Sequence, residues 1–311
     1  MADSDIEDNS PPFVPEEWIG SGRNLPQANN IPWGLLNYFS ALRDIPSAVK
    51  KQEYPNKHLN VVQFIASKLP RRTFSLPEVQ VHRCLSKLQT NEINDKWLKN
   101  RTLPPRQLVE KLDKHFRQAV LDGMQSVVDP AYPGSRLPLW SIQFWKDMWG
   151  MHDAQEEWKG GVAWLEERIK KSVTEEKKIY TDAHTLTKTL WWSEETFIPG
   201  ANQTTTQKFA AYLSDKTMMS TIHVDMMFSD LADRMEDDET LDSLVKIETL
   251  RFWREIDAAK SQKYFHSPSK PFLFRLEGRV KNKEVDFLVF PAHMDSVRHW
   301  LTFKLEHNIL K

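Results

Sequence analysis

The sequence contains a single cysteine, no long apolar run and almost no excess of charge of either sign. One cysteine, Cys84, excludes an internal disulfide and favours a reducing compartment, either the nucleus or the cytoplasm. No stretch approaches about 18 consecutive apolar residues, so we expect no membrane-spanning helix. The formal net charge of −1 gives no support for binding to nucleic acid or to an anionic membrane. The chain starts with acidic residues and lacks the basic and then apolar pattern of a secretory signal.

Local composition divides the 311 residues into four segments. Residues 1–30 carry six acidic side chains and one basic one among many Pro, Asn, Ser and Gly residues, which predicts a disordered acidic tail. Residues 31–196 are rich in Trp and have helical periodicity, which predicts an all-helical domain. The Pro, Gly, Asn and Thr residues of 197–206 break that periodicity and predict a linker. Residues 207–311 are predicted to form a second domain, in which strands follow helices.

Apolar residues at helical spacing define the expected core of the first domain. Leu108, Leu112, Phe116 and Val120 recur every four residues, which predicts a helix with one buried face. We expect a second helix over 79–88, and a kink or an end of a helix at Gly160-Gly161. Five of the twelve Trp residues fall within 140–164, where helical spacing indicates core packing rather than ligand stacking. This domain has no Gly-rich phosphate loop and no Cys/His metal spacing, so no cofactor is expected.

The second domain shows helical spacing first and alternating apolar residues later. Residues 218–231 predict an amphipathic helix whose apolar stripe consists of Val224, Met227, Phe228 and Leu231. Residues 241–256 also have helical spacing. The run from Phe287 to Phe290 is apolar on both faces, which is typical of a central strand. A polar turn and a further strand that opens with a His-Trp pair complete the pattern.

The order of these elements resembles the ubiquitin-like-protein-specific, desumoylating cysteine proteases. An apolar strand ends at Val289-Phe290-Pro291, and the pair His299-Trp300 opens the next strand, as in that family. Val224-Asp225 and Met227-Phe228 match the family's Ile-Asp and Met-Leu helix positions. The resemblance implies an α+β chain. An all-helical N-terminal domain, as in some fungal members, would precede the N-terminal half of a papain-like (adenain-like) protease domain with helices on a mixed sheet.

The resemblance also implies roles for three residues. His299 would be the general base that takes the proton of a cysteine nucleophile, and Trp300 would help to exclude water from the site. Met218 stands where the family has a Trp that shapes the groove for the Gly-Gly tail of the modifier, so Met218 and Trp300 are candidate substrate contacts. The orienting Asp and the nucleophilic Cys of the family lie further downstream than Lys311, so the chain is expected to be cut off before both. Cys84 precedes His299 and sits among apolar helix positions, which indicates an inert core thiol.

The leading interpretation is therefore a cysteine-type peptidase of this family that is inactive for lack of the nucleophile. Its partner would be a ubiquitin-like modifier or its conjugates, which the parent activity cleaves after Gly-Gly. The alternative is a non-catalytic interaction protein that uses the Trp-rich helical domain. A nucleic-acid-binding accessory protein has little support from charge. The histidines of the second domain have no i, i+4 pairing and no cysteine nearby, so no metal site is predicted (His223, His293, His299 and His307).

Overall fold

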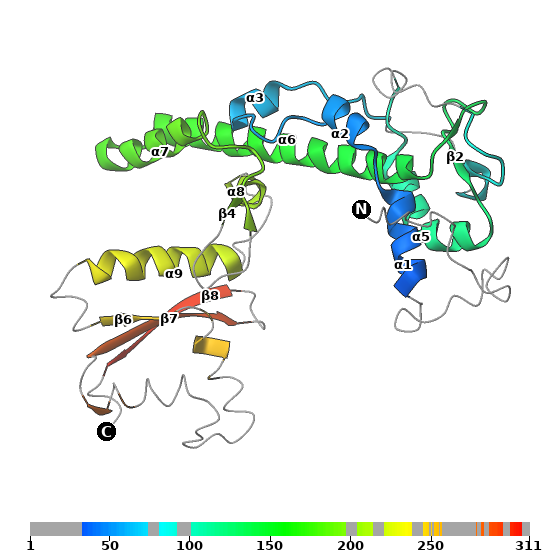
Figure 1. The fold of residues 1–311 in the computed structure, drawn as a ribbon. Coiled ribbons are helices and arrows are strands. Elements are labelled where there is room, and N and C mark those ends of the chain that lie inside the picture. Colours follow the sequence, from blue (N-terminus) through cyan, green and yellow to red (C-terminus); the bar gives the residue numbers. More distant parts are fainter. Residues whose placement is uncertain are drawn as a thin grey trace, which may run out of the picture. The chain divides into compact units, whose positions relative to one another are not determined.

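The structure, a computed structural model, is an α+β fold of helices and small sheets (Figure 1). It describes residues 33–73, 81–91, 101–196, 204–213, 221–237, 245–248, 250, 252–254, 256, 278, 281–282, 286–294 and 299–306. The chain divides into two compact units, Met1–Glu156 and Glu157–Lys311, and this division falls within helix α6 (Trp140–Lys171). None of the described helices is long and apolar enough to cross a membrane.

The first unit is built from helices around one apolar core. Its helices are α1 (Trp33–Arg43), α2 (Ser47–Glu53), α3 (Val61–Ala66), the 3-10 helix η3 (Val81–Cys84), α5 (Arg106–Leu121) and the first part of α6. The predicted stripe of α5 is confirmed, because Leu108, Leu112 and Phe116 are buried in this core. Pro105 stands at the N-cap of α5, where its missing N–H leaves no helix hydrogen bond unmade.

A small antiparallel sheet accompanies these helices, so the prediction of an all-helical first domain is wrong. Its strands are β1 (Leu85–Ser86), β2 (Ser126–Val128) and β3 (Arg136–Leu137), in the order β1-β2-β3. The helix predicted over 79–88 is also wrong in its described part, where η3 leads directly into β1. The Ser126 hydroxyl donates a hydrogen bond of 2.6 Å to the Leu88 carbonyl, so tertiary contacts override the helical spacing there.

Three of the five tryptophans of α6 are core residues, as their spacing predicted: Trp145, Trp149 and Trp158 are buried. Trp140 and Trp164 are half-buried. The Trp149 indole N–H donates to the Pro104 carbonyl at 3.0 Å, and the Trp158 indole N–H donates to the Trp192 carbonyl at 3.2 Å. The Trp149 and Trp158 rings therefore bury a large apolar surface, and the indole N–H of each has a hydrogen-bond acceptor.

Helix α6 runs through Gly160-Gly161 and ends at Lys171, so these glycines do not end the helix. Gly161 serves a close approach instead. A Cβ atom at this position would lie 3.1 Å from the Leu213 Cβ of helix α8 (Thr206–Leu213). Beyond α6, helix α7 (Thr174–Leu186) contacts it through the edge-on rings of Tyr180 and Trp164, whose centroids are 5.6 Å apart.

The described end of the predicted linker is folded against the preceding segment. Strand β5 (Thr204–Thr205) pairs antiparallel with β4 (Glu195–Thr196). The buried Thr206 hydroxyl accepts from the Glu194 N–H and donates to the Trp191 carbonyl, both at 2.9 Å. These bonds tie the start of α8 to the chain twelve and fifteen residues earlier.

The C-terminal part of the second unit is a mixed sheet with one helix against it, and Figure 1 shows α9 (Thr221–Glu236) lying along the sheet. Strand β6 (Val245–Ile247) pairs parallel with β7 (Phe287–Met294), which pairs antiparallel with β8 (His299–Glu306). Strand β7 is thus the central strand of this sheet, as predicted. The helix predicted over 241–256 is wrong at 245–247, because Val245 and Ile247 join the parallel ladder, whereas the described residues 250, 252–254 and 256 are helical.

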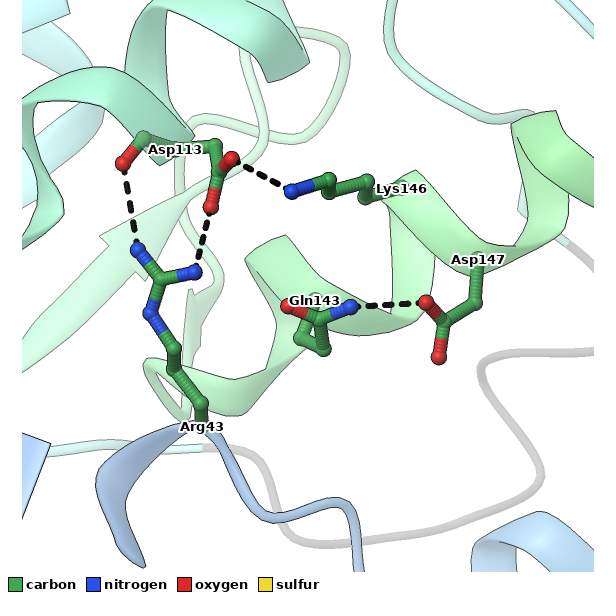
Figure 2. A network of polar contacts seen from close by, with 5 residues as sticks. All are labelled: Arg43, Asp113, Gln143, Lys146 and Asp147. Atoms are coloured by element: carbon green, nitrogen blue, oxygen red, sulfur yellow. Dashed lines mark hydrogen bonds and ion pairs between the residues drawn. The ribbon is translucent and has the colours of Figure 1, made fainter. Parts of the chain in front are cut away.

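One carboxylate links three helices of the first unit (Figure 2). Asp113 of α5 accepts from Arg43 of α1 at 2.6 Å and from Lys146 of α6 at 2.7 Å. Arg43 also donates to the Asp113 backbone carbonyl at 3.2 Å and stacks on the Phe116 ring at 4.3 Å. Partial burial raises the pKa of the Asp113 carboxyl, but the hydrogen bond from Lys146 and the charge of Arg43 outweigh this and hold it below its usual value.

We predict that Gly161→Leu lowers the free energy of unfolding by about 1–3 kcal/mol, because the new side chain must displace Leu213 in a packed contact. The same substitution in a Leu213→Gly background is expected to cost less, since glycine lacks the Cβ atom that the new side chain would meet. Urea denaturation of the four proteins of this double-mutant cycle measures the difference. An equal cost in both backgrounds would contradict the close approach.

We predict that Asp113→Asn lowers stability by about 1–2 kcal/mol, between the values for exposed and for buried ion pairs. The lowered pKa means that the native chain holds the ionised carboxylate more strongly than the unfolded chain does. Its stabilisation is complete above about pH 4 and is lost as the pH falls through the native pKa. Unfolding curves at several pH values should therefore show a shallower acid loss for the variant. The control is Asp44→Asn, because the Asp44 carboxylate is exposed and forms a 3.5 Å ion pair with Lys50.

Candidate functional site

The candidate site lies where β7 ends and β8 begins. In this antiparallel pair His299 is the register partner of Met294, and Trp300 is the partner of His293. The two residues that the sequence singled out therefore occupy the first two positions of β8, as the His-Trp pattern predicted. Met218 lies outside the described residues, so its predicted position in the groove stays a prediction.

Aromatic side chains pack against strands β7 and β8 near the candidate site. Leu288, Phe290 and Ala292 of β7 are buried on one face of the sheet. The Phe290 ring meets Phe252 edge-on at 4.7 Å between centroids and stacks on Phe303 of β8 at 5.5 Å. Pro291 is also buried and is paired with Thr302 in the ladder. The strand end that carries His293 is thus anchored by contacts two and three residues away.

Helix α9 is joined to the sheet by a carboxylate rather than by the whole predicted stripe. Val224 is buried, whereas Met227 and Leu231 are 57% and 44% exposed, so the prediction of one apolar stripe is wrong for these two. The Asp225 carboxylate accepts from the Leu250 N–H at 2.8 Å, which ties α9 to the segment that follows β6. Burial raises the pKa of the Asp225 carboxyl, against the opposing effects of this bond and of the Arg254 charge.

His223 of α9 packs against aromatic side chains. It is buried between two aromatic residues of α8, stacking on Tyr212 at 5.2 Å and meeting Phe209 edge-on at 5.3 Å. Among the residues that the structure describes, no group of three or more His, Cys, Asp or Glu side chains is placed to hold a metal ion. His223 is therefore explained by the contact between α8 and α9.

Cys84 has the properties of a core thiol, as its sequence environment predicted. It closes η3 in the first unit and is 1% exposed. Burial, and next the negative charge of Asp129, raise the pKa of this thiol to about 11. A thiol is nucleophilic only as the thiolate, so Cys84 is protonated and unreactive at neutral pH. It is the single cysteine among the 311 residues, which therefore offer no activated thiol for His299.

No protein-family model matches the chain, no curated protein matches it in sequence, and no solved structure matches it in fold. The family assignment thus continues to depend on the residues of the candidate site themselves. Sequence reasoning missed strand β6 and the bond between Asp225 and Leu250. The alternation of Val245 and Ile247 was the available signal for β6, but three residues are too few to outweigh the helical spacing around them.

We predict that native Cys84 reacts with iodoacetamide at pH 8 about 100-fold more slowly than the same thiol in the unfolded chain, because the raised pKa reduces the thiolate fraction. Mass spectrometry of timed samples with and without denaturant measures both rates. The matched control is Thr174→Cys in a Cys84→Ser background, which places a thiol at an exposed position. Labelling of native Cys84 as fast as this control would contradict the buried, neutral thiol.

Proposed function

We propose that this chain is a relative of the ubiquitin-like-protein-specific cysteine proteases. It would bind a ubiquitin-like modifier, or a conjugate of one, through residues 207–311, and the 311 residues by themselves would leave the bond after Gly-Gly intact. These residues would correspond to the N-terminal half of the papain-like domain. The partner implies a location in the nucleus or the cytoplasm.

The observation that carries this proposal is the placement of His299-Trp300 at the start of β8, opposite His293 and Met294 at the end of β7. The resemblance in sequence requires a central apolar strand followed by a strand that opens with His-Trp, and the mixed sheet has this order. The contact of α9 with β6 and β7 also agrees with a helix that packs on a mixed sheet.

The chemistry of the parent reaction explains why binding and cleavage separate here. Cleavage begins when a thiolate attacks the carbonyl carbon after Gly-Gly, and a histidine takes the thiol proton and later gives it to the leaving amine. His299 is proposed to hold the position of that base. The 311 residues by themselves supply no activated thiol from which this base could take a proton, so they would not form the acyl-enzyme alone.

Recognition of the modifier would not need the nucleophile. In the proposed complex Trp300 and Met218 contact the extended Gly-Gly tail, and a flat aromatic ring is a frequent source of binding energy at such a contact. The alternative function, an interaction surface made by the Trp-rich helices, has less support, because Trp145, Trp149 and Trp158 are buried in the cores.

We predict that the chain binds a SUMO-type modifier and does not hydrolyse a fluorogenic amide at the modifier's C-terminus. Isothermal titration calorimetry measures the binding, and release of the fluorophore measures hydrolysis. Trp300→Ala is expected to weaken binding by about 30-fold, as for loss of a central aromatic contact. Trp191→Ala is the matched control, because Trp191 is 41% exposed and lies outside the proposed surface.

Different results would contradict the absence of cleavage and the recognition of the modifier. Turnover of the fluorogenic substrate that disappears in His299→Ala would contradict the non-catalytic part. Absence of binding by a folded chain, checked by circular dichroism, would contradict recognition of the modifier. Equal affinities of Trp300→Ala, Trp191→Ala and the unaltered chain would place the contact elsewhere.

A further inference from the structure

A pocket of about 660 Å³ lies between α1 and α5 in the first unit, and none of its residues belongs to the proposed function. Its lining is contributed by successive turns of both helices: Leu36, Asn37, Phe39, Ser40, Arg43, Asp113, Lys114 and Arg117. The volume is in the range of pockets that enclose a small ligand or a few side chains of a partner. The pocket combines an apolar floor with charged walls.

The walls carry more positive than negative charge. Arg43, Lys114 and Arg117 face one carboxylate, Asp113, which is already engaged by Arg43 and by Lys146. Neither Lys114 nor Arg117 forms an ion pair within the described part of the chain, and both are exposed. The guanidinium of Arg117 lies 5.9 Å from the centre of the Phe39 ring. Two cations one helical turn apart on α5 are therefore left for a ligand.

The fixed part of the wall is held before any ligand arrives. Arg43 is bound by the side chain and by the backbone carbonyl of Asp113 and stacks on Phe116, so its guanidinium has little freedom (Figure 2). A pocket whose walls are ordered in the free protein loses less entropy when it binds. The floor consists of Phe39, which is 3% exposed, and the half-buried Leu36.

The polar atoms of the pocket distinguish between classes of anion. The Ser40 hydroxyl donates its proton to the Leu36 carbonyl at 3.1 Å, so its oxygen remains as an acceptor for a ligand. Asn37 offers an acceptor and two donors beside it. A phosphate group supplies only acceptors, whereas a peptide supplies backbone N–H donors together with acidic side chains. The lining thus suits a peptide better than a phosphate.

We propose that this pocket binds an acidic peptide segment of a partner protein, with Glu or Asp side chains on Lys114 and Arg117 and one apolar side chain on the half-buried Leu36. Backbone N–H groups of the peptide would donate to Ser40 and Asn37. Such binding weakens as salt is added, because exposed charges supply much of the attraction. The proposal is independent of modifier recognition, since its residues belong to the first unit.

The probe is a fluorescein-labelled 12-residue peptide with one Leu at its centre, two Glu on each side of that Leu and Ser at the other positions. Fluorescence anisotropy with the full chain at 50 mM and 500 mM NaCl measures affinity. We expect saturable binding that weakens at least fivefold at the higher salt concentration. Lys114→Glu/Arg117→Glu should weaken it at least tenfold, because two attractive contacts become repulsive.

Matched controls separate this site from general attraction between opposite charges. Lys177→Glu/Lys178→Glu makes the same change of charge at exposed positions of α7 and should leave the affinity within twofold. A peptide with Gln in place of Glu, and one with Ser in place of Leu, should each bind at least fivefold more weakly. Thermal melts of both double variants check that they are folded.

Several outcomes would overturn the proposal. Equal losses of affinity in the α5 and α7 variants would mean that the peptide binds through the net charge of the protein and not through the pocket. Tighter binding of inorganic phosphate or of a single-stranded oligonucleotide than of the peptide, lost in Lys114→Glu/Arg117→Glu, would assign the pocket to phosphate instead. No saturable binding at 50 mM NaCl would remove the site.

Discussion

Burial of the aromatic face of α6 is the interaction on which most of the described structure depends. Trp145 and Trp149 fill the core of the first unit, and Trp158 is buried in the second. Removing a buried aromatic side chain typically costs about 3–5 kcal/mol, a large part of the stability of a domain. Because the helix is continuous through 32 residues, its ring spacing also decides which residues can pack against it.

Polar groups at buried and half-buried positions determine how the elements pack around these rings. Asp113 joins α1, α5 and α6, and Asp225 joins α9 to Leu250. Gln155 of α6 donates to the Phe64 carbonyl at 2.8 Å at the end of α3. A buried acceptor or donor without a partner is costly, so each bond favours one arrangement of the elements over its alternatives. Apolar packing alone is much less selective.

The C-terminal sheet positions the residues of the proposed recognition site. Its central strand, β7, pairs with β6 on one side and with β8 on the other, and the Phe290 ring stacks on the Phe303 ring. The pairing of β7 with β8 sets His299 opposite Met294 and Trp300 opposite His293. Covalent catalysis needs in addition a thiol whose pKa is lowered, and burial of Cys84 has the opposite effect. The proposed recognition of the modifier therefore does not depend on Cys84.

The amino-acid sequence by itself determined the stripe of α5, the core role of the α6 tryptophans, the central position of β7 and the neutral state of Cys84. Each follows from local periodicity or from the apolar character of neighbouring residues, which contacts elsewhere in the chain do not reverse. The sequence also predicted that His299 opens the strand that follows β7, and the register opposite Met294 agrees with this. Only the tertiary structure decided the extended state of 85–86 and 245–247, the passage of α6 through Gly161, and the joining of Asp225 to Leu250. In these places the deciding partner lies far away in the sequence, and a hydrogen bond or a close approach to that partner outweighs the weak local preference.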